Sequence, residues 1–265
     1  MQSPPAATSP PTARELIAKP RPLVIAHRGD SKAGPENTLP AFAGAVRVGA
    51  DMVEFDYLHS ADGVPMVFHD TELDRTTNAG ELWGQGVRLA TKTLAELRQL
   101  DAGSWFDRKY SGTPIPTLGE AINVISAGSV AVIERKTGDA ATCIEVLESK
   151  QCVERVVLQA FDWDFLAECH RRCPALAIVA LGQKDLAPTQ LDRIEAIGAL
   201  GVGWENESTN EALIKAVHQR GLKLWVWTAD APDRIRQLAS WGANGIITNI
   251  PRTSLEVLRV ATTSM

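Results

Sequence analysis

Nine short runs of apolar, β-type residues recur along the 265-residue chain, with amphipathic helical patterns between most of them. The run at residues 65–69 is an exception, because fewer than ten residues separate it from the run that ends at Asp56. A parallel crossover needs about a dozen residues or more, and the intervening Asp62-Gly63 is typical of a β-hairpin. Eight strands therefore remain that a helix can follow. They are predicted at residues 23–27, 52–56, 131–134, 155–159, 177–181, 201–204, 223–227 and 245–248.

Eight regular β/α units close more naturally into a (β/α)₈ TIM barrel than they spread into an open doubly wound sheet, the alternative α/β fold. Asn37 or Thr38 is expected to cap the first helix, which ends at Gly49, a common stop signal. The later helices are expected at residues 118–126, 140–150, 163–172, 189–197, 210–220, 233–241 and 254–261.

Two segments depart from the alternation of strands and helices. Residues 1–21 are rich in Pro, Ala, Ser and Thr, and we expect a flexible leader there, followed by one barrel domain over residues 22–265. Residues 70–113 carry several aromatic residues and glycines but only one short helical pattern, at residues 93–100. We interpret residues 70–113 as a small capping insertion after the second strand and its hairpin, above the mouth of the barrel.

Charge and hydropathy exclude several classes of partner. The chain has 27 Lys and Arg residues against 32 Asp and Glu residues, a net charge of −5, so no basic excess points to nucleic acid. No apolar run is long enough to span a bilayer, and the first twenty residues lack the apolar core of a signal peptide. The chain length and the absence of a signal sequence favour a cytoplasmic location. We expect a monomer or a homodimer that acts on a small molecule. A periplasmic or secreted location would follow if a signal peptide had been removed.

Polar side chains gather where the predicted strands end, and barrel active sites lie at the C-terminal ends of strands. His27 ends the first strand. Glu54 and Asp56 end the second, and their spacing of two residues points both to the same side. His69 returns to the same mouth at the base of the hairpin. Glu134 and Lys136 end the third strand, Gln159 the fourth and Trp227 the seventh.

Three carboxylates at one mouth repel each other, and burial increases the repulsion. A divalent cation bound by Glu54, Asp56 and Glu134 would relieve it, and ligands that are all oxygen indicate Mg²⁺ or Ca²⁺ rather than zinc. The alternative is a structural network in which Arg28 and Lys136 neutralise the three carboxylates.

Two histidines at the same mouth suit the cleavage of a phosphate ester. Histidine titrates nearest neutral pH, so His27 and His69 can act as an acid–base pair. Arg28 and Lys136 supply cations for the phosphate. Glu36 orients Arg28 or a ligand hydroxyl, or holds its own loop.

From about Pro22 to Pro251 the chain resembles the short, bacterial-type glycerophosphodiester phosphodiesterases. That resemblance implies a barrel with a small capping insertion that hydrolyses glycerophosphodiesters to sn-glycerol 3-phosphate and an alcohol. The matching motifs are His27-Arg28-Gly29, Pro35-Glu36-Asn37-Thr38, Glu54-Phe55-Asp56, Asp62-Gly63, His69-Asp70, Glu134-Arg135-Lys136, Gln159, Trp227-Thr228 and Gly245-Ile246-Ile247-Thr248.

Carried over by position, the resemblance assigns a role to each of these groups. Glu54, Asp56 and Glu134 would bind one divalent metal ion, Ca²⁺ or Mg²⁺. His27 and His69 would be the catalytic acid–base pair. The phosphate and substrate contacts would be Arg28, Lys136, Glu36, Gln159 and Trp227.

Four positions depart from the family pattern: Ala160, Asn244, Asn249 and Arg135. None of them removes a proposed catalytic group. Two other functions stay open at this point. One is a related barrel phosphodiesterase that acts on lysophospholipid head groups, and the other is a non-catalytic barrel that binds phosphodiesters.

Overall fold

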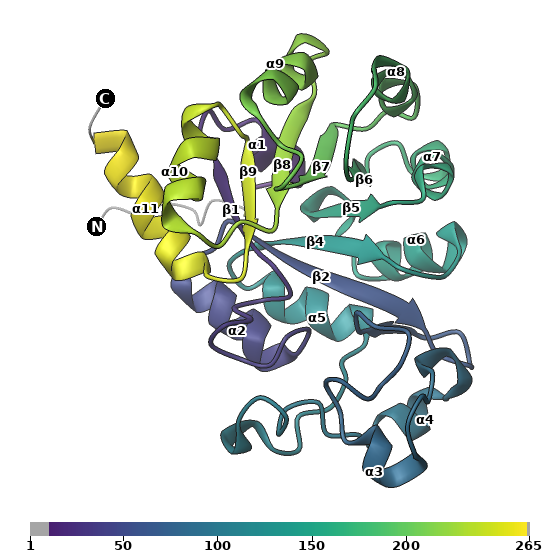
Figure 1. Cartoon of the computed structure of the whole chain (residues 1–265). Coiled ribbons are helices and arrows are strands. Elements are labelled where there is room, and N and C mark those ends of the chain that lie inside the picture. Colours follow the sequence, from purple (N-terminus) through teal and green to yellow (C-terminus); the bar gives the residue numbers. More distant parts are fainter. Residues whose placement is uncertain (1–10, 264–265) are drawn as a thin grey trace, which may run out of the picture.

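Eight parallel strands close into a barrel in the computed structural model, which describes residues 11–263 (Figure 1). The ring closes because β1 (Leu23–Ala26) pairs with both β2 (Met52–His59) and β9 (Gly245–Thr248). The predicted TIM barrel is confirmed, with each strand at the place that the apolar runs indicated. The remaining parallel strands are β4 (Val130–Arg135), β5 (Val156–Ala160), β6 (Ala177–Gly182), β7 (Gly201–Glu205) and β8 (Lys223–Trp227).

Helices surround the ring of strands (Figure 1). Side chains at the helix starts explain where several of them begin: Thr117 and Glu120 form a capping box, and Asp139 and Asn210 cap two later helices. In the described part of the chain, no helix has the length and apolarity needed to cross a membrane. The helices are α2 (Leu39–Val48), α5 (Leu118–Ile125), α6 (Ala140–Ser149), α7 (Trp163–Arg172), α8 (Pro188–Ala196), α9 (Glu211–Gln219), α10 (Pro232–Ser240) and α11 (Pro251–Thr263), with 3₁₀ turns at Leu89–Thr91, Arg108–Tyr110 and Val153–Arg155.

Side chains along β2 alternate between the outer face and the inner face of the barrel. Phe55 and Tyr57 belong to the apolar layer between strands and helices, whereas Met52 belongs to the layer inside the barrel. Successive side chains on a strand point to opposite faces. Glu54 and Asp56 therefore share the inward face with Met52, nearer the C-terminal end of the strand.

The hairpin prediction is also confirmed. β3 (Pro65–Val67) runs antiparallel to β2, with Tyr57 opposite Val67. The segment that follows contains two short helices, α3 (Ala79–Trp83) and α4 (Leu94–Leu97). It packs on the hairpin through a separate apolar cluster that contains Leu58, Met66, Phe68, Leu73, Ala79, Leu89, Leu97, Leu100, Ala102 and Ile115.

The structure differs from the expected flexible leader at residues 13–17. These residues form α1 (Ala13–Ile17), which begins with a capping box between Thr12 and Glu15. Leu16 and Ile17 are buried within the apolar layer inside the barrel, so α1 covers its N-terminal end. The Pro-rich composition of the leader concealed this short apolar turn, and residues 1–10 lie outside the described residues.

Shortening one of the buried α1 side chains should therefore weaken the fold. Leu16→Ala is expected to lower the free energy of unfolding by about 2–4 kcal/mol, because it leaves a cavity at the end of the barrel. Urea denaturation measures this loss, with the exposed Lys19→Ala as the matched control. A loss no larger than that of the control would contradict the packing of α1.

Candidate active site

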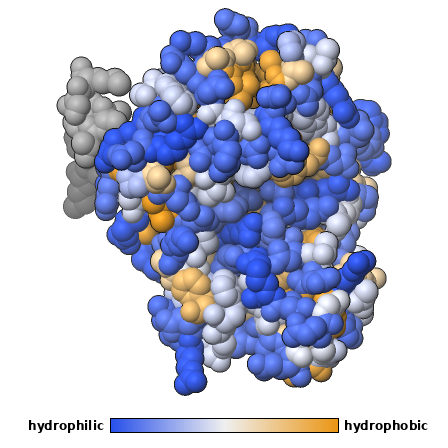
Figure 2. All heavy atoms as spheres, in the orientation of Figure 1, coloured by the Kyte–Doolittle hydropathy of each residue, from blue (hydrophilic) through white to orange (hydrophobic). Residues whose placement is uncertain are grey.

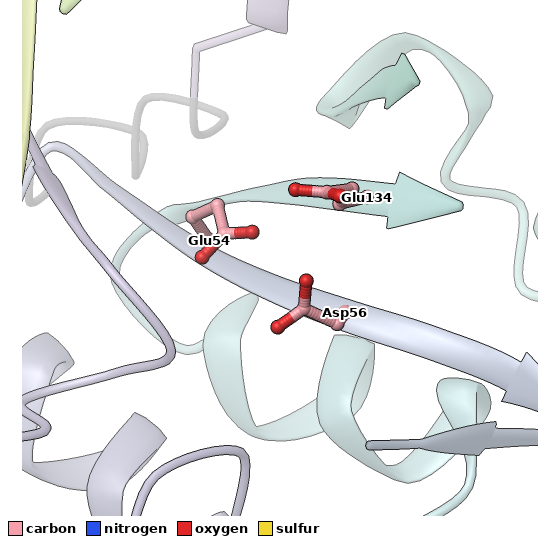
Figure 3. A group of neighbouring side chains, drawn as sticks. All are labelled: Glu54, Asp56 and Glu134. Atoms are coloured by element: carbon pink, nitrogen blue, oxygen red, sulfur yellow. The ribbon is translucent and has the colours of Figure 1, made fainter. Parts of the chain in front are cut away.

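Three buried carboxylates meet at the C-terminal end of the barrel (Figure 3). Glu54 and Asp56 extend from β2 and Glu134 from β4, where Asp56 and Glu134 lie opposite each other in the strand register. One oxygen from each side chain lies within 4.8 Å of the others. The three residues that the sequence suggested as metal ligands are thus brought together.

The three carboxylates alter one another's acidity. Burial, reinforced by the charges of Asp56 and Glu134, raises the pKa of Glu54 well above its usual value. Burial and the charge of Asp56 raise the pKa of Glu134 to about 7. Burial also acts to raise the pKa of Asp56, but the positive charges of Lys136 and Arg28 outweigh it and lower that pKa. Asp56 is therefore the member of the group that stays ionised most readily.

Two cations border this acidic group. The Lys136 ammonium lies 3.2 Å from Asp56 Oδ1 and also contacts Glu134. The Arg28 guanidinium lies 3.4 Å from Asp56 Oδ2, and the Arg28 backbone N–H donates to Glu54 Oε2 at 3.0 Å. These two positive charges balance the three carboxylates only when one carboxylate takes up a proton, in keeping with the raised pKa values of Glu54 and Glu134.

The polar side chains around the three carboxylates suit the binding of a hard divalent cation. Asn37 donates an amide hydrogen to Asp56 Oδ2 at 2.9 Å and so fixes that carboxylate. The Gln159 amide nitrogen lies 3.4 Å from Glu54 Oε1, while its own carbonyl oxygen is buried without a hydrogen-bond partner in the described structure. An oxygen-only donor set with an unpartnered buried oxygen beside it has the chemistry that Mg²⁺ or Ca²⁺ prefers.

His27 is held in one tautomer by an amide. Its Nδ1 lies 2.7 Å from Asn249 Oδ1. The Asn249 amide nitrogen donates to Asp230 Oδ2 at 2.7 Å, which turns the amide oxygen toward the ring. Nδ1 must then carry the proton, and Nε2 presents a lone pair. Burial and the neighbouring Arg28 lower the pKa of His27 to about 4, so the ring is neutral at pH 7.

His69 has a different partner. Its Nδ1 lies 2.6 Å from Asp70 Oδ1, so this carboxylate orients the ring. Thus Nδ1 of His27 contacts a neutral amide, whereas Nδ1 of His69 contacts a carboxylate. Two such environments are suited to a base and an acid at the same site.

Both histidines line one cavity of about 210 Å³. Phe161 and Trp227 form an aromatic wall, with ring centroids 5.8 Å apart in an edge-to-face arrangement. The Trp227 indole donates to the Gly203 carbonyl at 3.0 Å, which fixes the ring. The other lining residues are Arg28, Glu54, Glu134, Lys136, Gln159, Leu181 and Ile247.

Glu36, whose role the sequence left ambiguous, bridges two arginines. It accepts a hydrogen bond from Arg28 Nη1 at 2.8 Å and pairs with Arg75 through both carboxylate oxygens. Sequence reasoning missed Arg75 as well as the wall residue Phe161. It also missed the contact of Asn249 with His27, because no short-range pattern connects positions that are 222 residues apart.

Comparison with known proteins points to one family. The model of the glycerophosphoryl diester phosphodiesterase family matches residues 27–253. A glycerophosphodiester phosphodiesterase of Caldanaerobacter subterraneus subsp. tengcongensis is 36% identical, over 89% of this chain and 98% of its own. One from Bacillus subtilis is 31% identical, over 89% and 86%.

A solved structure is similar over the same extent. A phosphodiesterase of Oleispira antarctica, in complex with the product sn-glycerol-3-phosphate, superposes with a TM-score of 0.82. It is 29% identical and covers 90% of this chain and 97% of its own. The family match spans most of the chain, and the fold of this solved relative is the same closed barrel. The chain therefore belongs to the glycerophosphoryl diester phosphodiesterase family.

Proposed function

We propose that this protein hydrolyses glycerophosphodiesters to sn-glycerol 3-phosphate and an alcohol, using His27 and His69 as base and acid. The observation that carries the proposal is the pair of unlike histidine environments on one cavity, next to two cations and an acidic group. Family membership supports the substrate class, and the product bound in the Oleispira relative supports the identity of the product.

The reaction begins with the phosphate placed between Arg28 and Lys136. His27 Nε2 takes the proton of the glycerol 2-hydroxyl, whose oxygen attacks phosphorus. The bond to the alcohol oxygen breaks, and His69 gives that oxygen a proton. The cyclic phosphate that results is opened by water: His69 now accepts a proton from the water, and His27 returns its proton to the 2-oxygen. Both histidines are thereby restored.

Glu54, Asp56 and Glu134 would hold the metal ion, which we propose is Mg²⁺ or Ca²⁺. When bound, such an ion supplies positive charge that stabilises the phosphoryl oxygens. The protein's own cations add to this stabilisation, and Asn37 and the Arg28 backbone keep two of the carboxylates oriented. Phe161 and Trp227 give the cavity one apolar side.

A substrate panel tests the proposed function. Protein stripped with EDTA is incubated with glycerophosphocholine and glycerophosphoethanolamine, with Mg²⁺ or Ca²⁺ added back, and glycerol 3-phosphate is assayed enzymatically. We expect metal-dependent release of glycerol 3-phosphate. Binding of these diesters without any release would instead support the non-catalytic binding barrel and overturn the proposal.

Lysophospholipids belong in the same panel as a second candidate substrate class. The observation in their favour is Phe161, which is 48% exposed at the cavity wall and could contact an apolar chain. However, hydrophobic residues form separate small patches on the face seen in Figure 2, rather than a continuous groove. We therefore expect glycerophosphodiesters to be hydrolysed faster than lysophospholipids.

The acidic group also predicts how a metal affects stability at different pH. The pKa of Glu134 lies at about 7 in the folded protein, above its usual 4.5, so the fold without metal binds extra protons between these values. Its stability then falls as pH rises from about 4.5 to 7, by up to roughly 3 kcal/mol. Because a divalent cation relieves the repulsion, Ca²⁺ should raise Tm by several degrees more at pH 8 than at pH 5.

Differential scanning calorimetry measures this difference. Glu134→Gln is the matched variant, since it keeps the shape of the side chain and removes the charge. An equal Ca²⁺ shift at the two pH values in the wild type would contradict the prediction.

A further inference from the structure

The guanidinium of Arg75 joins two carboxylates, one of which contacts His69 and the other Arg28. Its Nε lies 2.5 Å from Asp70 Oδ2, and Nη1 and Nη2 donate to Glu36 at 2.9 and 2.7 Å. Asp70 in turn contacts His69 Nδ1 at 2.6 Å, and Glu36 accepts from Arg28 at 2.8 Å. A continuous chain of charged hydrogen bonds thus runs from the proposed acid to the proposed phosphate ligand.

The groups at the two ends of this chain come from separate segments. His69 and Asp70 follow β3, whereas Arg28 and Glu36 lie in the loop between β1 and α2. Arg75 belongs to the insertion and does not line the cavity that holds the histidines. Any effect of Arg75 on the reaction must therefore act through its two carboxylate partners.

The geometry requires an arginine. One planar guanidinium makes three hydrogen bonds to two carboxylates. A lysine ammonium on a flexible side chain cannot make these three hydrogen bonds in the same geometry. The Arg75 side chain is 45% exposed, so each ion pair alone would add little to stability. Arg75 can nevertheless hold catalytic groups in place, even where its ion pairs add little to the stability of the fold.

We propose that Arg75 is a positioning residue, which orients the His69 ring through Asp70 and the Arg28 guanidinium through Glu36. The inference rests on the proposed function for the roles of His69 and Arg28. Without Arg75, the Asp70 carboxylate is free to rotate away from Nδ1, and Glu36 keeps only one arginine partner. A displacement of about 1 Å at a reacting group can cost on the order of 100-fold in rate.

Kinetics of three variants test the proposal. Arg75→Ala and Arg75→Lys are expected to lower kcat about 10- to 100-fold on glycerophosphocholine with saturating metal. Roughly 20 mM guanidinium, far below the concentrations that unfold proteins, should restore part of the activity of Arg75→Ala but not that of Arg75→Lys. The control is Arg108→Ala in the same insertion, because the structure gives Arg108 no ion pair with any described residue.

A spectroscopic measurement keeps the test independent of turnover. In ¹⁵N-labelled protein, the Nδ1 signal of His69 should shift in Arg75→Ala and stay in place in Arg108→Ala. If the wild type released no glycerol 3-phosphate, the proposed function would fail, and the His69 signal would still decide the role of Arg75. An unmoved His69 signal, or a kcat of Arg75→Ala within twofold of the control in an active enzyme, overturns the inference.

Discussion

His69→Ala is expected to lower kcat by about 10²–10⁴ with natural glycerophosphodiesters, while KM changes little. The reason is that His69 donates the proton that the departing alcohol needs, whereas Arg28 and Lys136 bind the phosphate. His27→Ala should cause a loss of the same order, because the 2-hydroxyl then lacks a base. Steady-state assays of glycerol 3-phosphate release measure both effects.

A substrate with a better leaving group distinguishes the acid, His69, from the base, His27. A diester with nitrophenol as its alcohol needs no acid in the first step, so in a single turnover His69→Ala should release nitrophenol at close to the wild-type rate, and His27→Ala should not. Release of glycerol 3-phosphate by His69→Ala should stay slow, because His69 also activates the water that opens the cyclic phosphate. The exposed His218 on α9 provides a control substitution, His218→Ala. Turnover of glycerophosphocholine by His69→Ala at the rate of this control would show that the acid is assigned wrongly.

Glu54→Gln should lose activity and gain stability at the same time. Removing one proposed metal ligand is expected to lower kcat/KM about 10³-fold, which corresponds to roughly 4 kcal/mol of lost transition-state stabilisation. In the absence of metal, however, Tm at pH 8 should rise, because burial and two neighbouring carboxylates already oppose the charge of Glu54. Opposite signs for activity and stability distinguish a lost ligand from a damaged fold.

Calorimetric titration with Ca²⁺ and thermal unfolding measure the two effects of Glu54→Gln. The exposed Glu207→Gln serves as the matched control. Unchanged affinity for Ca²⁺ together with wild-type kcat/KM would remove Glu54 from the proposed ligand set.

Local patterns were sufficient to predict the barrel. Strands and helices alternated with clear start and stop signals, and Asp62-Gly63 distinguished the hairpin from a ninth parallel strand. β2 nevertheless extends to His59, three residues beyond the predicted end, because Tyr57, Leu58 and His59 pair with β3. Hydrogen bonds across a hairpin lengthen a strand in a way that apolar periodicity does not reveal.

The candidate site could be predicted only where its residues follow from strand geometry. Glu54, Asp56 and Glu134 meet because neighbouring parallel strands end at the same edge. The supporting groups depend on contacts between distant segments: Asn249 reaches His27 from the far end of the chain, and Arg75 reaches Glu36 from the insertion. One sequence contains no signal for such pairs.

Because α1 covers the N-terminal end of the barrel, that end is suited to attaching the enzyme to a solid support. Because α1 lies at the opposite end from the cavity, coupling through the exposed Lys19 just after it would leave the mouth facing the solution. A bead or electrode derivatised through Lys19→Cys should therefore retain access for substrate. Attachment through the insertion, which follows directly after His69, would instead bring the support close to the mouth.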